Sequence, residues 1–457
     1  MKGLFIFRRD LRLTDNTALL KASKECDKVY TVFIFTPEQV TDKNRFKSDI
    51  SIAFMISALD ELSKEIRKKG GQLVTLFGEN VDAVSRCIDQ WGIDTVYWNR
   101  DYTPYAKKRD AALEALCLKT GTEVSVSEDY YLNPPDSILT GGGTSYLKYT
   151  PYMNKAMAMG WPTPSTTRVQ FLSKSTKKIG SMGIQLKDAF SEFVDTDQVL
   201  VETYKREKAL GILRAHAKFK NYSDTRNDLD GQTTRLSAPI KYGIVSIREV
   251  AKAFKSNKAF IKQLIWRDFY AQILNEEPDV LGSALKEKYN KIKWSGSHSH
   301  FVKWCQGMTG FPIVDAGMRE LNKTGYMHNR ARLIVASFLI KTLLVDWQKG
   351  EKYFATQLVD YDPASNNGNW QWVASTGADS QPYFRIFNPW SQSKEHDADA
   401  IYIKKWVPEL SDVPVKCIHT WNECSTEKEF KNVDYPSPIV DYKEQREKAL
   451  KMYTLVL

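Results

Sequence analysis

The sequence predicts two structural classes in one chain: an α/β doubly wound parallel sheet at the N-terminus and an all-α C-terminal domain. Up to about residue 130, short apolar, β-rich runs alternate with helical patterns, which is the periodicity of βαβ units. From about residue 200 onward the pattern is helical with few strand signals. A length of 457 residues suits two or three domains.

The N-terminal elements alternate strand and helix along the chain. Gly3–Phe7 and Val29–Phe35 are short apolar strands, and Ile52–Lys69 has apolar residues at helical spacing. There follow a strand at Gln72–Phe77, a helix near Val81–Gln90, a strand at Thr95–Trp98, a helix near Pro104–Lys119 and a strand at Glu123–Val126. Sheets of this kind bind ligands beyond the carboxyl ends of their strands.

The predicted domains are an α/β domain over 1–130, a connector over 131–200 and a helical domain over 201–457. Proline and glycine clusters, among them Pro134-Pro135 and Gly141-Gly142-Gly143, interrupt any period in the connector. The helical domain ends in a helical segment over Tyr442–Tyr453.

Composition narrows the class of protein. A net charge of +10 and a pI near 9.0 favour a polyanionic partner such as nucleic acid, although charge alone does not establish one. The six Cys form no C-x-x-C pair and the six His no H-E-x-x-H, so we expect a reducing compartment and no metal site. The apolar run Leu4–Phe7 is too short for a signal peptide, and no stretch is long enough for a membrane helix. The prediction is an intracellular protein of cytoplasm or nucleus with no membrane partner.

A phosphate site is one interpretation of the run Thr233-Thr234-Arg235-Leu236-Ser237, which precedes Ala238-Pro239. Ser237 is predicted to cap a helix with Pro239 in its first turn. The free N–H groups and dipole of a helix N-terminus suit phosphate, but an ordinary capped helix fits the same spacing. No G-x-G-x-x-G follows the first strand, which disfavours dinucleotide binding by that route.

Chemistry-bearing residues are densest between Trp294 and Pro389. The run Asp360-Tyr361-Asp362-Pro363-Ala364-Ser365-Asn366-Asn367-Gly368-Asn369-Trp370-Gln371-Trp372 combines carboxylates, amides and indoles. Upstream lie Gly310–Arg319 and Met327–Arg332, where a helix is predicted to start near Met327. Downstream lies Pro382–Pro389.

Together these runs resemble the photolyase/cryptochrome flavoproteins over nearly the whole chain, and most closely the cyclobutane pyrimidine dimer (CPD) photolyases. The resemblance implies FAD as cofactor. The implied contacts to its diphosphate are Tyr222, Thr233, Thr234, Arg235, Leu236 and Ser237. Those implied near the flavin ring are Asn329, Arg332, Asp360, Asp362 and Asn366, with Arg332 paired to Asp360 and Asn366 facing flavin N5.

The resemblance also implies an electron-transfer wire and a DNA face. The wire is Trp294, Trp347 and Trp370, for which simple packing is the alternative. The implied catalytic residues that line the substrate pocket or face the flavin are Gln263, Trp266, Asn329, Asn366 and Trp372. Gln263, Trp266 and Arg267 should share one helix face. The implied contacts to DNA phosphates are Arg226, Arg267, Arg330 and Arg385. The implied partner is UV-damaged DNA with a pyrimidine dimer flipped into the FAD cavity, and we expect a monomer.

Two further features of the family are an antenna chromophore, whose identity stays open here, and a motif after the first strand, to which we assign no chemistry. Folate-binding members carry Asn-Glu where this chain has Tyr105-Ala106, so the antenna chromophore could be a deazaflavin, folate or none. The run Arg8-Arg9-Asp10-Leu11-Arg12 matches the family's first-strand motif and is interpreted as structural.

Two departures bear on the reaction. Gln263 stands where CPD photolyases usually have Glu, and Leu333 where they usually have Met. The (6-4) photolyases use two histidines at the positions of Asn329 and Leu333, and neither is His here. The sequence therefore favours light-dependent splitting of CPDs by electron transfer from photoexcited reduced FAD. The alternatives are a blue-light photoreceptor of cryptochrome type without repair, a photolyase of single-stranded DNA, and a nucleic-acid-binding module without catalysis.

Overall fold

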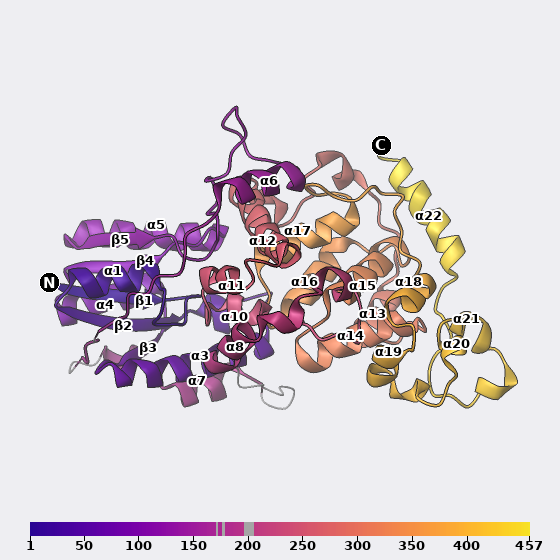
Figure 1. Ribbon diagram of the computed structural model, residues 1–457, viewed down its shortest axis with the longest axis horizontal. Helices are drawn as coiled ribbons and strands as arrows, with labels where there is room; N and C mark the ends of the chain where they lie inside the picture. The colour runs from indigo at the N-terminus through magenta and orange to yellow at the C-terminus, as the bar shows by residue number, and fades with distance from the viewer. Residues whose placement is uncertain (171, 176–178, 196–204) are drawn as a thin grey trace. The chain divides into compact units, whose positions relative to one another are not determined.

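The computed structural model describes residues 1–170, 172–175, 179–195 and 205–457, which divide into two compact units (Figure 1). The sheet unit comprises Met1–Lys220, Thr234–Pro278 and Val359–Ala364, and the helical unit comprises Asn221–Thr233, Asp279–Leu358 and Ser365–Leu457. The predicted fold class, a doubly wound parallel sheet followed by helices, is confirmed. The domain boundaries predicted from the sequence stay a prediction, and residue 200 lies outside the described residues.

The sheet unit contains a five-stranded parallel sheet in the order β3-β2-β1-β4-β5. Its strands are β1 (Lys2–Phe7), β2 (Lys28–Phe35), β3 (Leu73–Phe77), β4 (Thr95–Asn99) and β5 (Glu123–Ser127). Leu4 of β1 pairs with Tyr30 on one side and Val96 on the other, so the chain winds outward from β1 in both directions. Each strand lies within a residue of the predicted run at either end.

Helices connect the strands and cover both faces of the sheet. They are α1 (Thr17–Glu25), α2 (Pro37–Val40), α3 (Asp49–Lys68), α4 (Asn80–Trp91) and α5 (Pro104–Thr120). Alternate strand residues such as Leu4 and Ile6 point to one face, where they form a core with buried residues of α4 and α5. On the other face, Cys26 at the end of α1 lies 3.4 Å from the hydroxyl of Tyr97.

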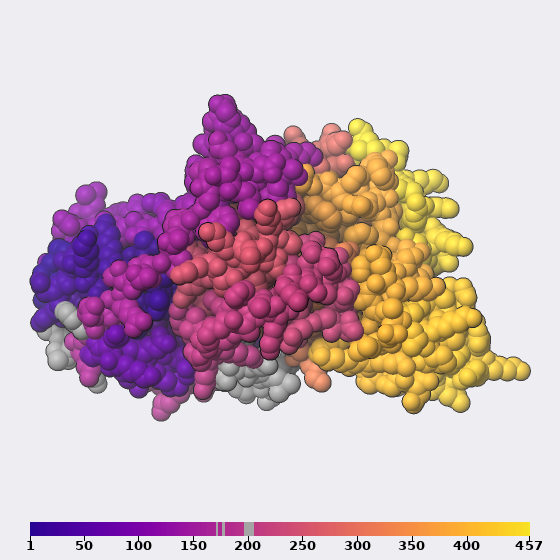
Figure 2. Space-filling view, viewed as in Figure 1, coloured from indigo at the N-terminus to yellow at the C-terminus, as the bar shows by residue number. Residues whose placement is uncertain are grey.

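The rest of the sheet unit is mostly helical. Its remaining α-helices are α6 (Tyr149–Met159), α7 (Leu186–Phe193), α8 (Arg206–Arg214), α10 (Ser237–Lys241), α11 (Ile247–Ala253) and α12 (Lys258–Glu276). The predicted connector thus contains two helices, α6 and α7. Before α6, the hydroxyls of Thr140 and Thr144 lie 2.8 Å apart and close a small hairpin that projects from the surface of the unit (Figure 2).

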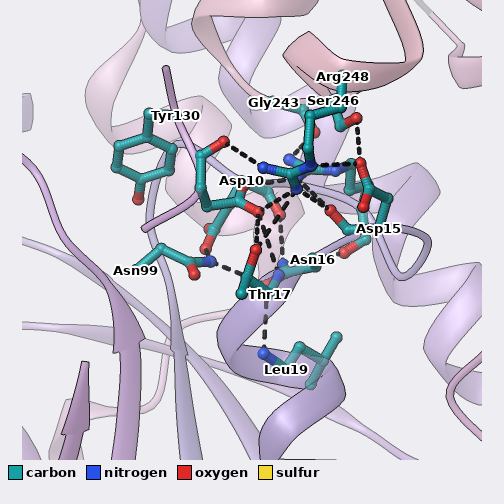
Figure 3. A network of polar contacts seen from close by, with 12 residues as sticks. Asp10, Asp15, Asn16, Thr17, Leu19, Asn99, Tyr130, Gly243, Ser246 and Arg248 are labelled. Carbon is teal, nitrogen blue, oxygen red and sulfur yellow. Dashed lines mark hydrogen bonds and ion pairs between the residues drawn. The ribbon is translucent and has the colours of Figure 1, made fainter. Parts of the chain in front are cut away.

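A buried polar network ties α11 to the segments that follow β1 and β5 (Figure 3). Arg248 of α11 lies 2.9 Å from the carboxylate of Asp15 and 2.7 Å from that of Asp129. Arg12 lies 2.5 Å from Asp129 as well. Burial alone would raise the pKa of Asp129, but the two guanidiniums hold it below its usual value. Arg12, the last residue of the Arg8–Arg12 motif, therefore takes part in this buried network.

The helical unit packs around α14 (Pro312–Thr324), which contacts α13 (His298–Gln306), α15 (Asn329–Lys341), α18 (Pro389–His396) and α19 (Ile401–Trp406). Its other α-helices are α9 (Tyr222–Thr225), α16 (Trp347–Gln357), α17 (Pro363–Ala374, whose first two residues belong to the sheet unit), α20 (Val415–Ile418), α21 (Trp421–Cys424) and α22 (Tyr442–Thr454). A disulfide joins Cys417 to Cys424, a pairing that their spacing did not signal. None of the described helices is long and apolar enough to cross a membrane.

Candidate functional site

Helix α12 of the sheet unit presents the predicted pocket residues Gln263, Trp266 and Arg267 as half-buried side chains among buried neighbours. The indole of Trp266 stacks on the ring of Tyr149, with centroids 3.6 Å apart and planes inclined by 8°. Edge contacts to Phe269 further fix its orientation. The result is a rigid, flat aromatic surface one turn along the helix from the Gln263 amide, which donates to the Ala259 carbonyl at 3.4 Å.

Arg267 is held in place by groups of its own unit. Its Nη1 donates to the carbonyl of Tyr130 at 2.6 Å, and its guanidinium lies 4.5 Å from the ring centroid of Tyr131. Asp268, 4.0 Å away, is fully buried, and that burial raises its pKa to about 7. With a pKa of about 7, the carboxyl of Asp268 is only partly ionised near neutral pH and compensates the charge of Arg267 only in part.

The short segment Val359–Ala364, which carries Asp360 and Asp362, belongs to the sheet unit. Asp362 forms an ion pair with Arg9 at 3.1 Å, and Tyr361 stacks on Phe46 with centroids 6.3 Å apart. The sequence interpretation gave Arg9 no role beyond structure. Its partner lies more than 350 positions away in the chain, so no local signal could have shown this pair.

The predicted phosphate run leads into α10, which begins at Ser237. The predicted N-cap was therefore wrong by one position, because Leu236 occupies the cap and no side chain caps the helix. Thr233, Arg235 and Ser237 are exposed, Thr234 is half-buried and Leu236 is buried. Arg235 has a left-handed backbone, with φ of 48°, immediately before this turn. The hydroxyls of this run are thus not used in capping.

In the helical unit, α15 carries Asn329, Arg330 and Arg332. The helix begins at Asn329 rather than at Met327, because His328 caps it: Arg330 N donates to His328 Nδ1 at 3.1 Å. Burial, reinforced by the Arg332 and Arg330 charges, lowers the pKa of His328 to about 4, so the ring stays neutral and can accept this bond. Arg332 Nε donates to the Met327 carbonyl at 2.9 Å. The implied pair of Arg332 with Asp360 stays a prediction.

Three of the four predicted phosphate-contacting arginines belong to the helical unit. Arg330 Nη2 donates to Asn227 Oδ1 at 2.9 Å, and among the described residues no carboxylate forms an ion pair with Arg330 or Arg226. Burial lowers the pKa of Arg330, the nearby Glu395 raises it in part, and the charge of Arg226 lowers it by less. Arg385 is exposed, and its backbone carbonyl accepts a 3.0 Å hydrogen bond from the buried Lys341. Arg226 and Arg330 thus lie close enough to interact electrostatically, with Glu395 also nearby.

Helix α17 places Asn366, Trp370 and Trp372 in different environments. Asn366 is 9% exposed, and its Nδ2 donates to the Glu351 carbonyl at 3.0 Å. Its Oδ1 accepts no hydrogen bond from any described residue. Trp370 is buried, whereas Trp372, two positions on, is half-buried. Their different exposure agrees with the ~200° that separates two such positions on a helix.

No ring contact joins Trp294, Trp347 and Trp370 to one another in the described part of the chain. Trp370 instead meets the rings of Phe354 and Trp304, with centroids 5.0 and 6.3 Å away. Trp347 is buried, and Trp294 is half-buried beside Tyr453 at 6.3 Å. The wire stays a prediction. The contact of Trp304 with Trp370 was not predicted from the sequence, because the local pattern around Trp304 is that of any packing tryptophan.

The fold and these residues define a two-unit protein with an α/β sheet and a helical part rich in amides, indoles and arginines. The model for the DNA photolyase domain matches residues 4–169, and that for the FAD binding domain of DNA photolyase matches residues 260–455. A deoxyribodipyrimidine photo-lyase of Alkalihalophilus pseudofirmus is 36% identical over 98% of this chain and 96% of its own. The chain belongs to the DNA photolyase family, and the prediction of an enzyme of the photo-lyase class is confirmed.

Two solved structures show how far the likeness reaches. An archaeal photolyase from Sulfolobus tokodaii, crystallised with two FAD molecules, is 39% identical, covers 100% of both chains and has a TM-score of 0.89. A cryptochrome of Synechocystis sp. is 26% identical, covers 99% of both chains and has a TM-score of 0.88. The family's FAD-binding domain confirms FAD as the cofactor.

The residues present fit this cofactor. Because Nδ2 of Asn366 is anchored on the Glu351 backbone, its carbonyl oxygen remains as a fixed acceptor, which suits the N–H that a reduced flavin carries at N5. The uncapped start of α10 leaves backbone N–H groups and hydroxyls for phosphate oxygens. Tyr222, whose pKa burial raises, is half-buried and neutral.

Proposed function

We propose that this protein repairs cyclobutane pyrimidine dimers in DNA in a light-dependent reaction. The observation that carries the proposal is the α12 surface, where Trp266 is held flat by Tyr149 at 3.6 Å with Gln263 one turn away. Two fused pyrimidine rings are flat and apolar, and a rigid indole offers them a stacking face at little cost in side-chain entropy. Relatives that align over nearly the whole chain are named for this reaction class.

The protein's own residues bind the damaged DNA, orient the flipped bases and exclude water from them. Gln263 offers an amide to the carbonyl and N–H edges of the flipped bases, and Asn329 and Trp372 complete the proposed pocket. Arg226 and Arg330 bind phosphates beside the lesion because no carboxylate pairs with them in the described chain. FAD, when bound, supplies light absorption and reversible one-electron transfer. We also propose that Asp360, Asp362, Arg332 and Asn366 surround the flavin, and that Trp294, Trp347 and Trp370 conduct electrons to it.

The substitution of Gln for the usual Glu sets a limit on the chemistry at position 263. An amide donates a hydrogen bond to a base carbonyl but carries neither a charge nor an acidic proton. Repair is therefore proposed to proceed more slowly than in relatives with Glu. Repair of (6-4) photoproducts by a histidine pair is not proposed, because Asn329 and Leu333 occupy those positions.

The test is repair of two defined duplexes under blue light, one with a thymine dimer and one with a (6-4) photoproduct. The expected result is light-dependent loss of the dimer and no change in the (6-4) lesion. Trp266→Ala should bind FAD normally and lose most repair, whereas Trp161→Ala, a half-buried tryptophan outside the proposed pocket, should repair as wild type. A flavin-loaded protein that leaves the thymine dimer intact in light refutes the proposal.

A further inference from the structure

We propose that Arg9, in the motif after strand β1, is a positioning residue that fixes Asp362 and thereby ties the FAD site to the parallel sheet. The inference rests on the proposed placement of Asp362 beside the flavin. It assigns a role to a residue that sequence interpretation treated as purely structural.

Arg9 is buried between carboxylates and aromatic rings. It is 8% exposed, and its Nη1 lies 3.1 Å from Asp362 and 3.6 Å from Asp101. The guanidinium also lies 5.0 Å from the ring centroid of Tyr130. Burial opposes its charge, yet the neighbouring acids, Asp101 foremost, hold the pKa of Arg9 well above its ordinary value. Removal of one member of a buried ion pair is costly to the other, which couples Arg9 and Asp362.

The segment that carries Asp362 depends on the sheet unit for its position. Val359–Ala364 is the shortest of the three segments of this unit, and α17 continues from it in the helical unit. Within the sheet unit, Phe46 stacks on Tyr361 and Arg9 pairs with Asp362, so two successive residues of the segment are attached to it. Arg9 supplies the charged attachment, and Phe46 the apolar one.

The neighbouring charges make Asp362 sensitive to Arg9. Lys241 is half-buried close by: desolvation, together with the charges of Arg9 and Arg267, lowers its pKa to about 8, and Asp362 and Asp101 act in the opposite direction. With Arg9 replaced by a neutral residue, Asp362 loses its 3.1 Å ion-pair partner within the sheet unit. The carboxylate then loses its charged attachment to the segment after β1.

Arg8 provides a matched control within the same motif. Its side chain is 8% exposed, against 9% for that of Arg9, and its guanidinium lies 5.2 Å from the ring centroid of Trp98. Its ion pair, however, is with Asp110 of α5 at 2.8 Å, and no contact links it to Val359–Ala364 in the described chain. Loss of Arg8 should therefore disturb the sheet unit as much as loss of Arg9, without altering Asp362.

The experiment measures the dissociation constant of FAD from the full-length protein for Arg9→Gln, Asp362→Asn, their combination, Arg9→Lys and Arg8→Gln. Arg9→Gln should weaken FAD binding ~10-fold, as for two charged residues in contact. Arg9→Lys should recover most of that loss, and Arg8→Gln should stay within about twofold of wild type. The combined variant should bind FAD no more weakly than Asp362→Asn alone. The flavin reduction potential should shift in Arg9→Gln and not in Arg8→Gln.

Equal losses in Arg9→Gln and Arg8→Gln, or strictly additive effects in the combined variant, overturn the role of Arg9. If Asp362→Asn itself leaves FAD binding unchanged, the placement of Asp362 and the inference fail together. Far-ultraviolet circular dichroism of each variant monitors folding, and Arg9→Lys decides the matter should Arg9→Gln not fold. Dimer repair is not a readout here, so failure of the proposed function would show separately.

Discussion

Replacement of Arg330 by Gln should lower the affinity for DNA and also make that affinity less dependent on salt concentration. Arg330 sits beside Arg226, donates to Asn227 at 2.9 Å and forms no ion pair with a carboxylate in the described chain. Neighbouring cations with no described carboxylate at ion-pair distance can bind a phosphate without first breaking an ion pair, and each contact releases a condensed counterion. Arg319 is the matched control, because Glu409 engages it through both oxygens at 2.8 and 2.9 Å.

The magnitude follows from one phosphate contact for each arginine. The slope of log affinity against log salt should become shallower by ~0.9 in Arg330→Gln on double-stranded DNA. Between 50 and 200 mM salt, the ratio of wild-type to variant affinity should therefore shrink about 3.5-fold. For the double variant with Arg226→Gln it should shrink about 12-fold.

Fluorescence anisotropy with a labelled, dimer-containing duplex measures these slopes over a series of salt concentrations. Arg319→Gln should keep the wild-type slope. The reasoning is refuted if Arg330→Gln and the wild type give parallel lines, or if Arg319→Gln is as shallow as Arg330→Gln.

Three further predictions concern the helical unit. Burial lowers the pKa of Lys341 from 10.5 to about 7, so between these values the unfolded chain binds a proton that the native state does not. The contribution of Lys341 to the free energy of unfolding therefore rises by roughly 1.4 kcal/mol per pH unit. Between pH 8 and 9, the free energy of unfolding measured with urea should rise by about that much less in Lys341→Met than in the wild type. The same pH dependence in both proteins would contradict the lowered pKa of Lys341. Trp370→Phe should block photoreduction of the flavin yet leave repair by chemically reduced protein mostly intact, and normal photoreduction would remove Trp370 from the wire. Asn366→Asp should change which flavin redox states accumulate in light, as absorbance spectra report; identical spectra count against a position opposite N5.

Local pattern was sufficient for the elements and for the fold class. The strand over Gly3–Phe7 and the helix over Pro104–Lys119 were placed within a residue, because strand and helix periods differ and Gly121, with φ of 70°, ends the helix. The half-buried face of Gln263, Trp266 and Arg267 follows from helical spacing alone. The fold class could be predicted because it too follows from the order of strand and helix periods along the chain.

Long-range contacts could not be predicted in this way. The pair of Arg9 with Asp362 and the stack of Trp266 on Tyr149 each join segments that only the folded chain brings together. The cap of α10 was misplaced by one residue because Ser237 and Leu236 differ in cap propensity, and here the tertiary fold overrides propensity. The role of Lys341, buried at the end of α15, was likewise invisible, since its partners are Ser375 Oγ and the Arg385 carbonyl.

Loss of thymine dimer per light flash is the measurement that tests the central claim most directly. A defined duplex with one dimer is mixed with excess protein whose flavin has been chemically reduced, and intact dimer is counted after each flash. The account predicts a stepwise loss of dimer that stops whenever the light is off. Dimers that persist through the flash series, while anisotropy shows DNA bound and absorbance shows flavin bound, would contradict it.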